Sequence, residues 1–194
     1  ISLRALQSPL KLFILIATLF ALGNFSYMFF VLKAKEAFLG IFSERMANAL
    51  PIFLYVLFNV SYAALSIPCG VLADKLGKRQ VLILGYSLFG FTCLGFITFG
   101  SFIPLLLLFL LYGAFYAFVD GVQRAYVSDL SIAKLRGTAL GTFHTSTGLA
   151  ALPASVIAGF LWNLNPDFTF LYGAIAAFSA SVLLAIIGGA KSEA

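Results

Sequence analysis

Long apolar runs separated by short polar connections extend along the whole chain. Each run has close to the roughly 20 residues that a helix needs to cross about 30 Å of hydrocarbon. The runs are too long for barrel strands and show no strict alternation of apolar and polar positions, so the pattern favours helices. It predicts six membrane-spanning helices near residues 13–32, 52–72, 81–99, 103–122, 139–162 and 168–187.

The proline positions agree with these six helices. Proline costs little in the first turn of a helix, and three prolines stand at predicted helix starts: Pro51, Pro104 and Pro166. Pro68 and Pro153 lie inside the second and fifth runs, where we expect them to bend the helices. We expect the connection at residues 33–50 to extend the first helix before the chain turns at Gly40.

The composition indicates that lipid is the solvent of these helices. Hydrophobic residues make up 62% of the 194 residues and charged residues 10%, and the mean hydropathy is +1.05. A soluble domain of this size needs more charge to cover its surface. Cys69 and Cys93 both fall in apolar runs and are predicted to be free and packed. We therefore predict an all-α membrane protein that forms a single transmembrane domain over residues 1–194.

Basic residues are gathered in alternate connections. Of the 12 Lys and Arg residues, nine fall on the side that holds both predicted termini: Arg4, Lys11, Lys75, Lys78, Arg79, Arg124, Lys134, Arg136 and Lys191. The opposite side carries the other three, Lys33, Lys35 and Arg45. Basic residues are enriched on the cytoplasmic side of membranes. The distribution therefore predicts that both termini are cytoplasmic, in the inner (plasma) membrane of a cell.

The connection after the second predicted helix, residues 70–80, reads Gly-Val-Leu-Ala-Asp-Lys-Leu-Gly-Lys-Arg-Gln. Gly70 permits close helix approach, Asp74 stands where a helix meets the cytoplasm, and Gly77 allows a tight turn. Three basic side chains would hold the connection at the anionic inner leaflet: Lys75, Lys78 and Arg79. A simple positive-inside hairpin would carry similar charges but would need no fixed spacing.

This spacing resembles the signature loop of the major facilitator superfamily, G-x-L-a-D-[RK]-x-G-[RK]-[RK], at every consensus position. The resemblance implies one half of a twelve-helix secondary transporter, with two inverted three-helix repeats in each half. In that family the acidic and basic residues of the loop form a charge network that closes the cytoplasmic side during alternating access. The resemblance therefore implies a conformational latch centred on Asp74 and Arg79. Its further members are Gly70, Lys75, Gly77 and Lys78.

Later segments resemble the C-terminal half of such a transporter. They are residues 112–116, the pairs Asp120-Gly121, Arg124-Ala125 and Asp129-Leu130, and residues 136–141. The fifth predicted helix lacks the Gly-Pro motif of many N-terminal halves, and the chain begins with Ile1 rather than Met. We therefore expect helices seven to twelve of a carrier whose N-terminal half is missing. Either that half or a second copy of the chain is the expected partner.

Polar side chains recur every four residues on the fourth predicted helix, at Tyr112, Tyr116 and Asp120. At 1.5 Å per residue, Asp120 lies about 25 Å from Ile103, near the inner boundary of the membrane. Asp120 and Arg124 form an i,i+4 pair in the favoured order, and both are added to the predicted latch. Two interpretations of Asp120 stay open: a local ion pair linked to the signature loop, or proton coupling and substrate contact.

Other polar residues lie within the apolar runs, where such residues usually face a partner or a cavity. The resemblance implies that the first and fourth helices line a substrate cavity, flanked by the second and fifth. The predicted cavity residues are Asn24, Tyr27, Tyr55, Asn59, Tyr62, Tyr112, Tyr116 and His144. Hydrogen bonding between helices alone is the alternative for this set. For His144, the only histidine, a neutral packing role stands beside a proton relay.

The third and sixth predicted helices carry few polar side chains and are predicted to be lipid-facing supports without a site. An intramembrane serine protease is disfavoured, because Gly85-Tyr86-Ser87-Leu88 lacks the second glycine of a G-x-S-G nucleophile loop. A channel would need a filter-like loop or a ring of acids, whereas a sensor built on a carrier fold stays open. We expect no enzyme activity, no cofactor, no metal site and no nucleic-acid partner.

The favoured function is a secondary carrier of a small solute. The stripe of aromatic and neutral polar residues suits an amphipathic organic solute, as in multidrug efflux, and a sugar or metabolite carrier is the alternative. Coupling to the proton gradient is expected, because nucleotide-binding motifs are absent from the sequence and the resemblance implies a gradient-driven transporter. Import and export are equally compatible with the sequence.

Overall fold

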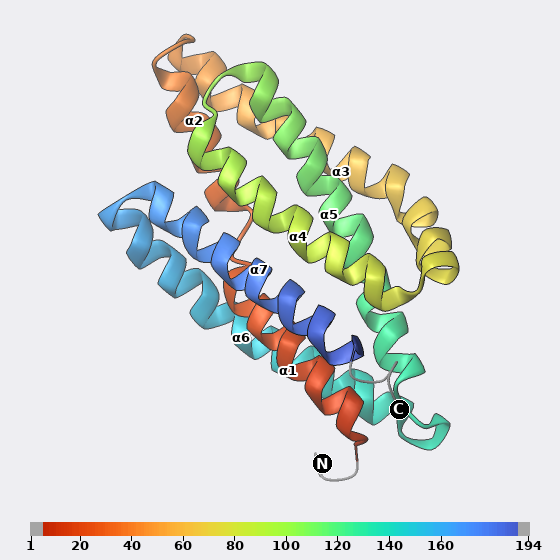
Figure 1. Cartoon of the computed structure of the whole chain (residues 1–194). Coiled ribbons are helices and arrows are strands. Elements are labelled where there is room, and N and C mark those ends of the chain that lie inside the picture. The colour runs from red at the N-terminus through yellow and green to blue at the C-terminus, as the bar shows by residue number, and fades with distance from the viewer. Residues whose placement is uncertain (1–5, 190–194) are drawn as a thin grey trace.

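The computed structural model describes residues 6–189, which form a bundle of long helices (Figure 1). In chain order the elements are α1 (Ser8–Gly23), α2 (Met28–Leu39), α3 (Glu44–Leu76), α4 (Lys78–Thr98), α5 (Phe102–Asp129), the 3₁₀ turn η2 (Ala133–Leu135), α6 (Arg136–Leu164) and α7 (Pro166–Gly189). With α1 and α2 counted as one span, six helices among the described residues are long and apolar enough to cross a membrane. The predicted all-α, six-helix fold is therefore confirmed.

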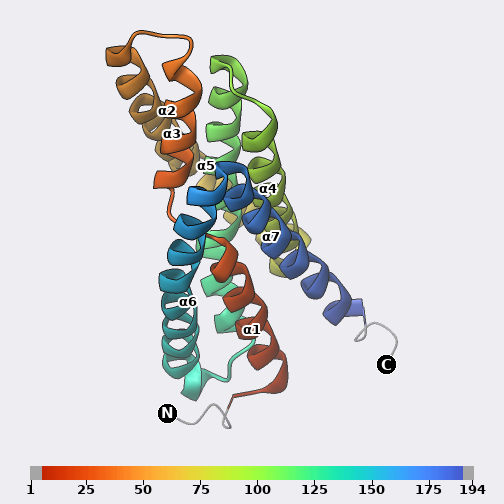
Figure 2. The ribbon, with the colours of Figure 1, turned by 90° about the vertical axis from the view of Figure 1, so that its left-hand side faces the viewer.

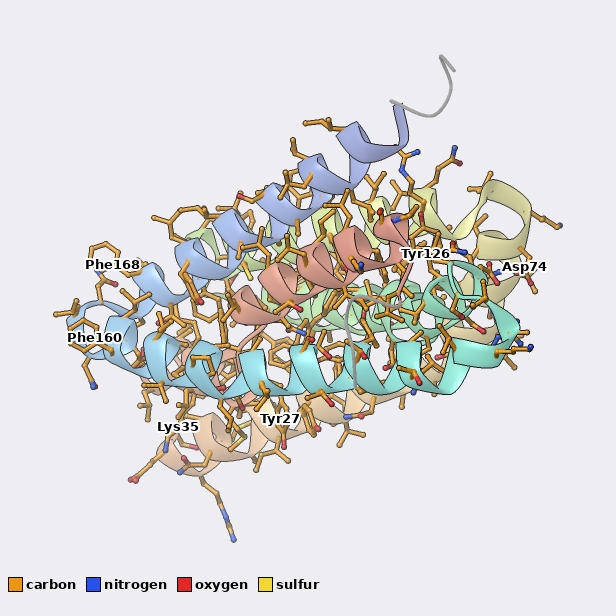
Figure 3. All side chains as sticks on the ribbon, turned by 90° about the horizontal axis from the view of Figure 1, so that it is seen from below. Tyr27, Lys35, Asp74, Tyr126, Phe160 and Phe168 are labelled. Atoms are coloured by element: carbon orange, nitrogen blue, oxygen red, sulfur yellow. The ribbon has the colours of Figure 1, made fainter. Side chains whose placement is uncertain are left out.

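The connections between spans lie alternately at the two ends of the bundle. The start of α1, the α3–α4 and α5–α6 connections and the end of α7 share one end, and the other three connections share the opposite end (Figures 1 and 2). In Figure 3, Asp74 lies at the first end, Lys35 and Phe168 lie at the second, and Tyr27 lies between them. This alternation follows the predicted distribution of basic residues, of which Arg4 and Lys191 fall outside the described part.

The helices pack as two interlocked groups of three spans. The first span of each group packs on the second and third spans of the other: α5 contacts α3 and α4, and α1 contacts α6 and α7. The two third spans, α4 and α7, also contact each other. This exchange is the arrangement that two inverted three-helix repeats produce. It leaves α4 and α7 in the interior and α3 and α6 at the margins of the bundle.

The first predicted helix is interrupted in the structure. α1 ends at Gly23, where the Asn24 amide donates to the Phe20 carbonyl at 3.0 Å, and α2 begins at Met28. A broken helix inside a membrane must satisfy its freed backbone groups internally. The Tyr172 hydroxyl of α7 does so for one of them by donating to the Leu22 carbonyl. After the break the chain continues as α2 to Leu39, and Gly40 follows it as predicted.

The position predicted for Pro51 is wrong. Pro51 was expected at a helix start, but α3 begins at Glu44, about two turns earlier, and Pro51 is buried inside it. The Ala47 amide, hydrogen-bonded to the Ser43 carbonyl at 2.9 Å, belongs to this additional helix. Hydropathy missed these turns because residues 44–50 are mostly polar or small.

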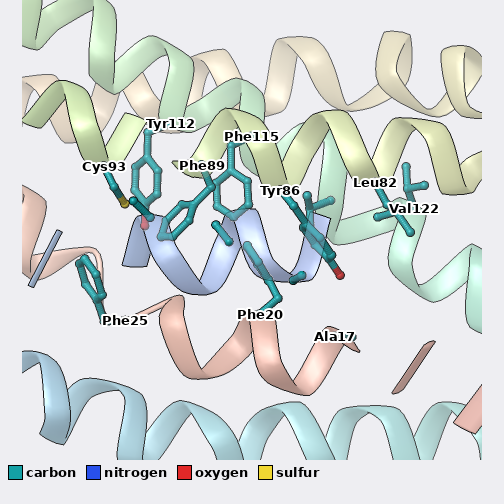
Figure 4. Packing of buried hydrophobic residues seen from close by; sticks show 14 of the residues in the cluster. Ala17, Phe20, Phe25, Leu82, Tyr86, Phe89, Cys93, Tyr112, Phe115 and Val122 are labelled. Carbon is teal, nitrogen blue, oxygen red and sulfur yellow. The ribbon is translucent and has the colours of Figure 1, made fainter. Parts of the chain in front are cut away.

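Aromatic side chains fill the interior between α1, α4 and α5 (Figure 4). Phe20 of α1 stacks on Tyr86 of α4 with ring centroids 4.1 Å apart, and Phe89 lies edge-on to Phe20 at 5.6 Å. Gly113 lets α5 approach α3 closely, because a Cβ at this position would lie 2.5 Å from the Phe58 carbonyl oxygen. The core is therefore built from large aromatic rings in contact with one another, and α3 and α5 pack closely at Gly113.

The prediction that the third and sixth spans are lipid-facing supports stays a prediction, but within this chain each of them has a large buried face. In the most apolar 18-residue stretch of each helix, 56% of the residues of α4 and 50% of those of α7 are buried, against 17% in both α3 and α6. The polarity of α4 and α7 is low because they form the interior of the bundle. Each still exposes some apolar side chains, such as Phe91 and Ile175.

Candidate functional site

The signature loop, residues 70–80, is a very tight connection between α3 and α4. Gly77 is the single residue between the two helices, and its amide closes the last turn of α3 by donating to the Ala73 carbonyl at 3.0 Å. The φ of Gly77 is +98°, a backbone conformation that strongly favours glycine. The glycine is therefore required by the turn itself, as the sequence predicted.

Lys78, the first residue of α4, ties the loop to the end of α5. Its Nζ lies 2.7 Å from Oδ2 of Asp129 and 3.8 Å from Oδ1 of Asp74. The Lys78 side chain is 23% exposed, whereas that of Asp74 is 74% exposed, so the contact with Asp129 is the stronger of the two. Asp129 was not predicted as a latch residue, although its place in the charged connection after the fourth predicted helix was visible in the sequence.

Arg79 does not contact Asp74, the residue with which the resemblance groups it. Its Nε donates to the Leu184 carbonyl at 2.9 Å and its Nη2 donates to the Ala185 carbonyl, both near the end of α7. Successive residues of a helix point about 100° apart, so Arg79 faces α7 while Lys78 faces α5. A guanidinium near the C-terminal end of a helix also opposes the negative end of its dipole. The remaining basic member, Lys75, is exposed.

Asp120 joins α5 to α3 at a point one helix turn before Arg124. Its Oδ2 accepts hydrogen bonds from the Tyr62 hydroxyl of α3 and from Nη2 of Arg124, both at 2.8 Å. The structure therefore places the predicted i,i+4 pair in contact and adds Tyr62 as a third member. Tyr62 was predicted as a cavity residue, and here it also positions the Asp120 carboxylate.

Two cavities of about 290 Å³ each share Asp120 in their walls. The loop cavity lies between α3 and α5, beside the signature loop. It is lined by Tyr62, Ser66, Gly70, Ala73, Asp74, Lys78, Ala117, Asp120, Gly121, Val122, Arg124 and Ala125. Five of the predicted latch residues face this one cavity, so the structure brings most of the predicted latch together.

The central cavity lies between α1, α5 and α6, where α1 ends at the break in the first span. Its thirteen lining residues are Ala17, Phe20, Ala21, Asn24, Phe115, Tyr116, Val119, Asp120, Gln123, His144, Thr147, Gly148 and Ala151. Three predicted cavity residues are among them: Asn24, Tyr116 and His144. The sequence analysis missed Gln123 and Thr147, although each lies three residues after a residue that it singled out and so on the same helix face.

Tyr112, a predicted cavity residue, lines neither of the two cavities. It is fully buried, with its ring stacked between Phe30 at 4.3 Å and Phe58 at 4.9 Å, and its hydroxyl has no hydrogen-bond partner among the described residues. Tyr116 and Tyr112 lie on the same face of α5, but Tyr116 lines the central cavity whereas Tyr112 is covered by α2 and α3. Spacing alone does not distinguish these two environments.

Tyr27, Tyr55 and Asn59 also lie outside the walls of the two cavities. The Tyr27 and Tyr55 rings stack at 4.6 Å, and Nδ2 of Asn59 donates to the Tyr55 carbonyl at 2.8 Å. For Asn59 the interhelical alternative is not observed either, because this hydrogen bond stays within α3. All three residues therefore form a separate aromatic and amide group, near the break in the first span.

An ion pair at the opposite end of the bundle was missed. Nζ of Lys33 on α2 lies 2.7 Å from Oδ1 of Asp167 at the start of α7. The two residues are 134 positions apart, and no local spacing signals their contact. Among the described residues, no group of three His, Cys, Asp or Glu side chains could hold a metal ion.

Comparison with known proteins agrees with the signature loop. Residues 13–192 match the family described as Major Facilitator Superfamily. The chain is also 52% identical, over 187 residues, to an uncharacterized MFS-type transporter from the archaeon Methanocaldococcus jannaschii. That match covers 96% of this chain and 47% of the relative, so the chain spans about half the length of the curated relative that it matches.

Proposed function

The chain belongs to the major facilitator superfamily, and on that premise we propose that it is the C-terminal six-helix half of a secondary transporter that moves a small organic solute by alternating access. It is a multi-pass membrane protein of a transporter family. The half-length match to the archaeal relative supports the assignment to one half. The N-terminal half, or a second copy of this chain, would supply the facing wall of the pathway.

The observation that carries this proposal is the position of Asp120 between the central cavity and the loop cavity. A solute or proton in the central cavity can change the charge or the contacts of Asp120. That change alters the hydrogen bonds that Asp120 accepts from Arg124 and Tyr62. Both residues line the loop cavity together with Asp74 and Lys78, so the change affects the latch residues there. One carboxylate can therefore link cavity occupancy to the latch.

The expected coupling ion is the proton, and the expected orientation places the signature loop in the cytoplasm of a plasma-membrane protein. The carboxylate of Asp120 is the proton acceptor that this coupling would use, because it lies near the membrane boundary and is only partly buried. The basic residues at the same end of the bundle support the orientation. An amphipathic solute, as in multidrug efflux, fits the mixed aromatic and polar lining.

Flux in proteoliposomes tests the proposal. The full-length protein would be reconstituted, a pH gradient imposed, and movement of labelled amphipathic solutes measured with and without an uncoupler. We expect flux that collapses with the gradient and is strongly reduced by Asp120→Asn, with Glu36→Gln as the matched control. Glu36 is an exposed carboxylate of α2 that lines neither cavity.

Failure of every solute class to move under any gradient would exclude the carrier and favour a sensor or scaffold on the same fold. Gradient-driven flux of sugars in place of amphipathic solutes would identify a sugar or metabolite carrier. Flux that is insensitive to the pH gradient would refute proton coupling while leaving alternating access intact.

A further inference from the structure

Some of the hydrogen-bond donors in and beside the central cavity are already used by the protein. Nε2 of Gln123 donates to the Tyr86 hydroxyl at 2.7 Å, and the Thr147 hydroxyl donates to the Phe143 carbonyl at 2.9 Å. The donors of Tyr62 and Arg124 both engage Oδ2 of Asp120. The Thr147 and Tyr62 hydroxyls therefore have no proton left for a bound solute, whereas Asn24, Tyr116 and His144 of the same wall carry donors of their own.

Several hydrogen-bond acceptors of the central cavity have no donor among the described residues. Oδ1 of Asn24 is buried and has no hydrogen-bond partner among the described residues. Oδ1 of Asp120 and the amide oxygen of Gln123 receive no hydrogen bond from the described residues either. A carboxylate can accept about four hydrogen bonds, so the Arg124 and Tyr62 contacts leave part of Asp120 available. A buried acceptor without a donor is costly, and a ligand that supplies one removes the cost.

The charged residue of the central cavity also favours a ligand that donates hydrogen bonds. Asp120 is the only Asp, Glu, Lys or Arg among the thirteen lining residues, and Arg124 lines the other cavity. The cavity also receives the last turn of α1, through Phe20, Ala21 and Asn24, and the C-terminal end of a helix carries partial negative charge. Arg124 already pairs with Oδ2 of Asp120, so the polar part of the cavity attracts positive charge through the remaining Oδ1 and the end of α1.

Part of the wall is apolar, and Tyr116, His144 and Thr147 add further polar groups. Phe20, Phe115 and Val119 line one part of the cavity, opposite in chemistry to the acceptor group. A volume of about 290 Å³ lies near the lower end of the range for small-ligand pockets. Such a site suits a small molecule with an apolar ring and one donor-rich, charged end.

From these observations we propose that the central cavity binds the protonated amino group of a small amphipathic amine, held by Asp120, Asn24 and Gln123. The physiological role of this site rests on the proposed transport function, but the binding of the amine is tested independently of transport. The ammonium group donates up to three hydrogen bonds, which matches the three acceptors. A neutral alcohol of the same shape supplies one hydrogen bond and no charge.

The test compares three molecules of equal shape: 2-phenylethylammonium, 2-phenylethanol and propylbenzene. Binding to the full-length protein in lipid nanodiscs is measured by calorimetry at neutral pH, with empty nanodiscs as the blank. We expect the ammonium compound to bind about tenfold more tightly than the alcohol, because charge-assisted hydrogen bonds are the stronger ones. Propylbenzene is expected to bind no more tightly than the alcohol.

Four variants locate the effect. Asp120→Asn is expected to abolish the preference for the ammonium compound, whereas Asp120→Glu keeps it, which separates loss of charge from loss of folding. Asn24→Leu should weaken ammonium binding several-fold, and its matched control is Asn59→Leu, which replaces an exposed amide of α3 outside both cavities. Equal affinity for the ammonium compound and the alcohol would overturn the proposal, as would a preference that survives both Asp120→Asn and Asn24→Leu.

The same molecules separate this inference from the transport proposal. Gradient-driven flux of 2-phenylethanol, without any preference for the ammonium compound in binding, would overturn the amine site and leave the carrier in place. Selective binding of the ammonium compound that disappears in Asp120→Asn, in a protein that moves no solute, would support the site and exclude the carrier.

Discussion

The helix pair α4 and α7 differs sharply from the pair α3 and α6, although all four are long apolar helices of one bundle. About half of the most apolar stretch of α4 and α7 is buried within the chain, against 17% for α3 and α6. Mean hydropathy does not explain this, because the values for α3 and α4 are 1.8 and 1.9. The difference lies in where small and large residues are placed.

In α4, small residues face the interior and let neighbours approach. A Cβ at Gly85 would lie 2.5 Å from Val119, and one at Gly95 would lie 2.4 Å from Leu108. In α6 the buried stripe is also small, at Ala150, Ala154 and Ala158, but the large side chains point outward. The exposed set on α6 includes Leu149, Leu152, Val156 and Phe160. The marginal helices therefore keep their large apolar side chains for lipid or for the other half proposed above.

The largest expected effect comes from truncating a ring in each pair. Phe89→Ala removes a fully buried ring of α4 and should destabilise the protein by about 3 kcal/mol through the cavity left behind. Phe160→Ala removes a ring of α6 that is 66% exposed and should change stability by less than about 0.5 kcal/mol. Thermal unfolding of both variants in the same detergent measures the contrast. Equal destabilisation would show that α6 is packed as tightly as α4.

Glycine substitutions sharpen the same comparison. Gly113→Ala places a methyl group against the Phe58 carbonyl and the Ser61 side chain and should cost about 1–3 kcal/mol. Gly141→Ala on α6 meets nothing within 4 Å and should be neutral or slightly stabilising, because alanine favours the helix. The midpoints of thermal unfolding report the difference. A harmless Gly113→Ala would mean that α3 and α5 do not approach each other as described.

Arg79 links the two interior helices. Arg79→Gln removes charged hydrogen bonds to the Leu184 and Ala185 carbonyls of α7 and should lower stability by about 1 kcal/mol. Lys75→Gln, a basic residue of the same loop that is exposed, is the matched control and should have little effect. Hydrogen exchange at the end of α7 should increase in Arg79→Gln alone. An increase of the same size in Lys75→Gln would point to loop charge in place of the carbonyl contacts.

The smallest effect is expected where α3, α4 and α5 meet at the surface. Asp129→Asn removes the 2.7 Å contact with Lys78 and should cost less than about 1 kcal/mol, a loss that fades at high salt. Asp74→Asn should cost less still, because its contact with Lys78 is 3.8 Å long. Denaturation at low and high salt measures both variants. A larger loss for Asp74→Asn would restore Asp74 as the centre of the latch.

The length and hydropathy of the apolar runs were sufficient to predict the six spans, because the thickness of the membrane sets helix length. They did not reveal the break at residues 24–27, since one Asn and one Ser in a long apolar run barely change its hydropathy. Nor did they distinguish Tyr112 from Tyr116. Both residues share one helix stripe, and only the position of α2 and α3 decides which of them is covered.

The candidate site was predictable where residues act over short sequence distances. The Asp120–Arg124 pair and the Gly77 turn follow from local spacing and are present as expected. The contact of Arg79 with α7 and the pair of Lys33 with Asp167 depend on which helix faces meet after folding. A sequence pattern carries no such information when the partners are more than 100 residues apart.

The break in the first span has a consequence for the order in which this protein can be completed. The Leu22 carbonyl freed by the break is satisfied by the hydroxyl of Tyr172, which lies 150 residues later in the chain. While the ribosome is still synthesising the intervening spans, this part of the first span lacks that native partner. The interruption can therefore gain this native partner only after α7 has entered the membrane, so the first span of the chain is completed by a helix made five spans later.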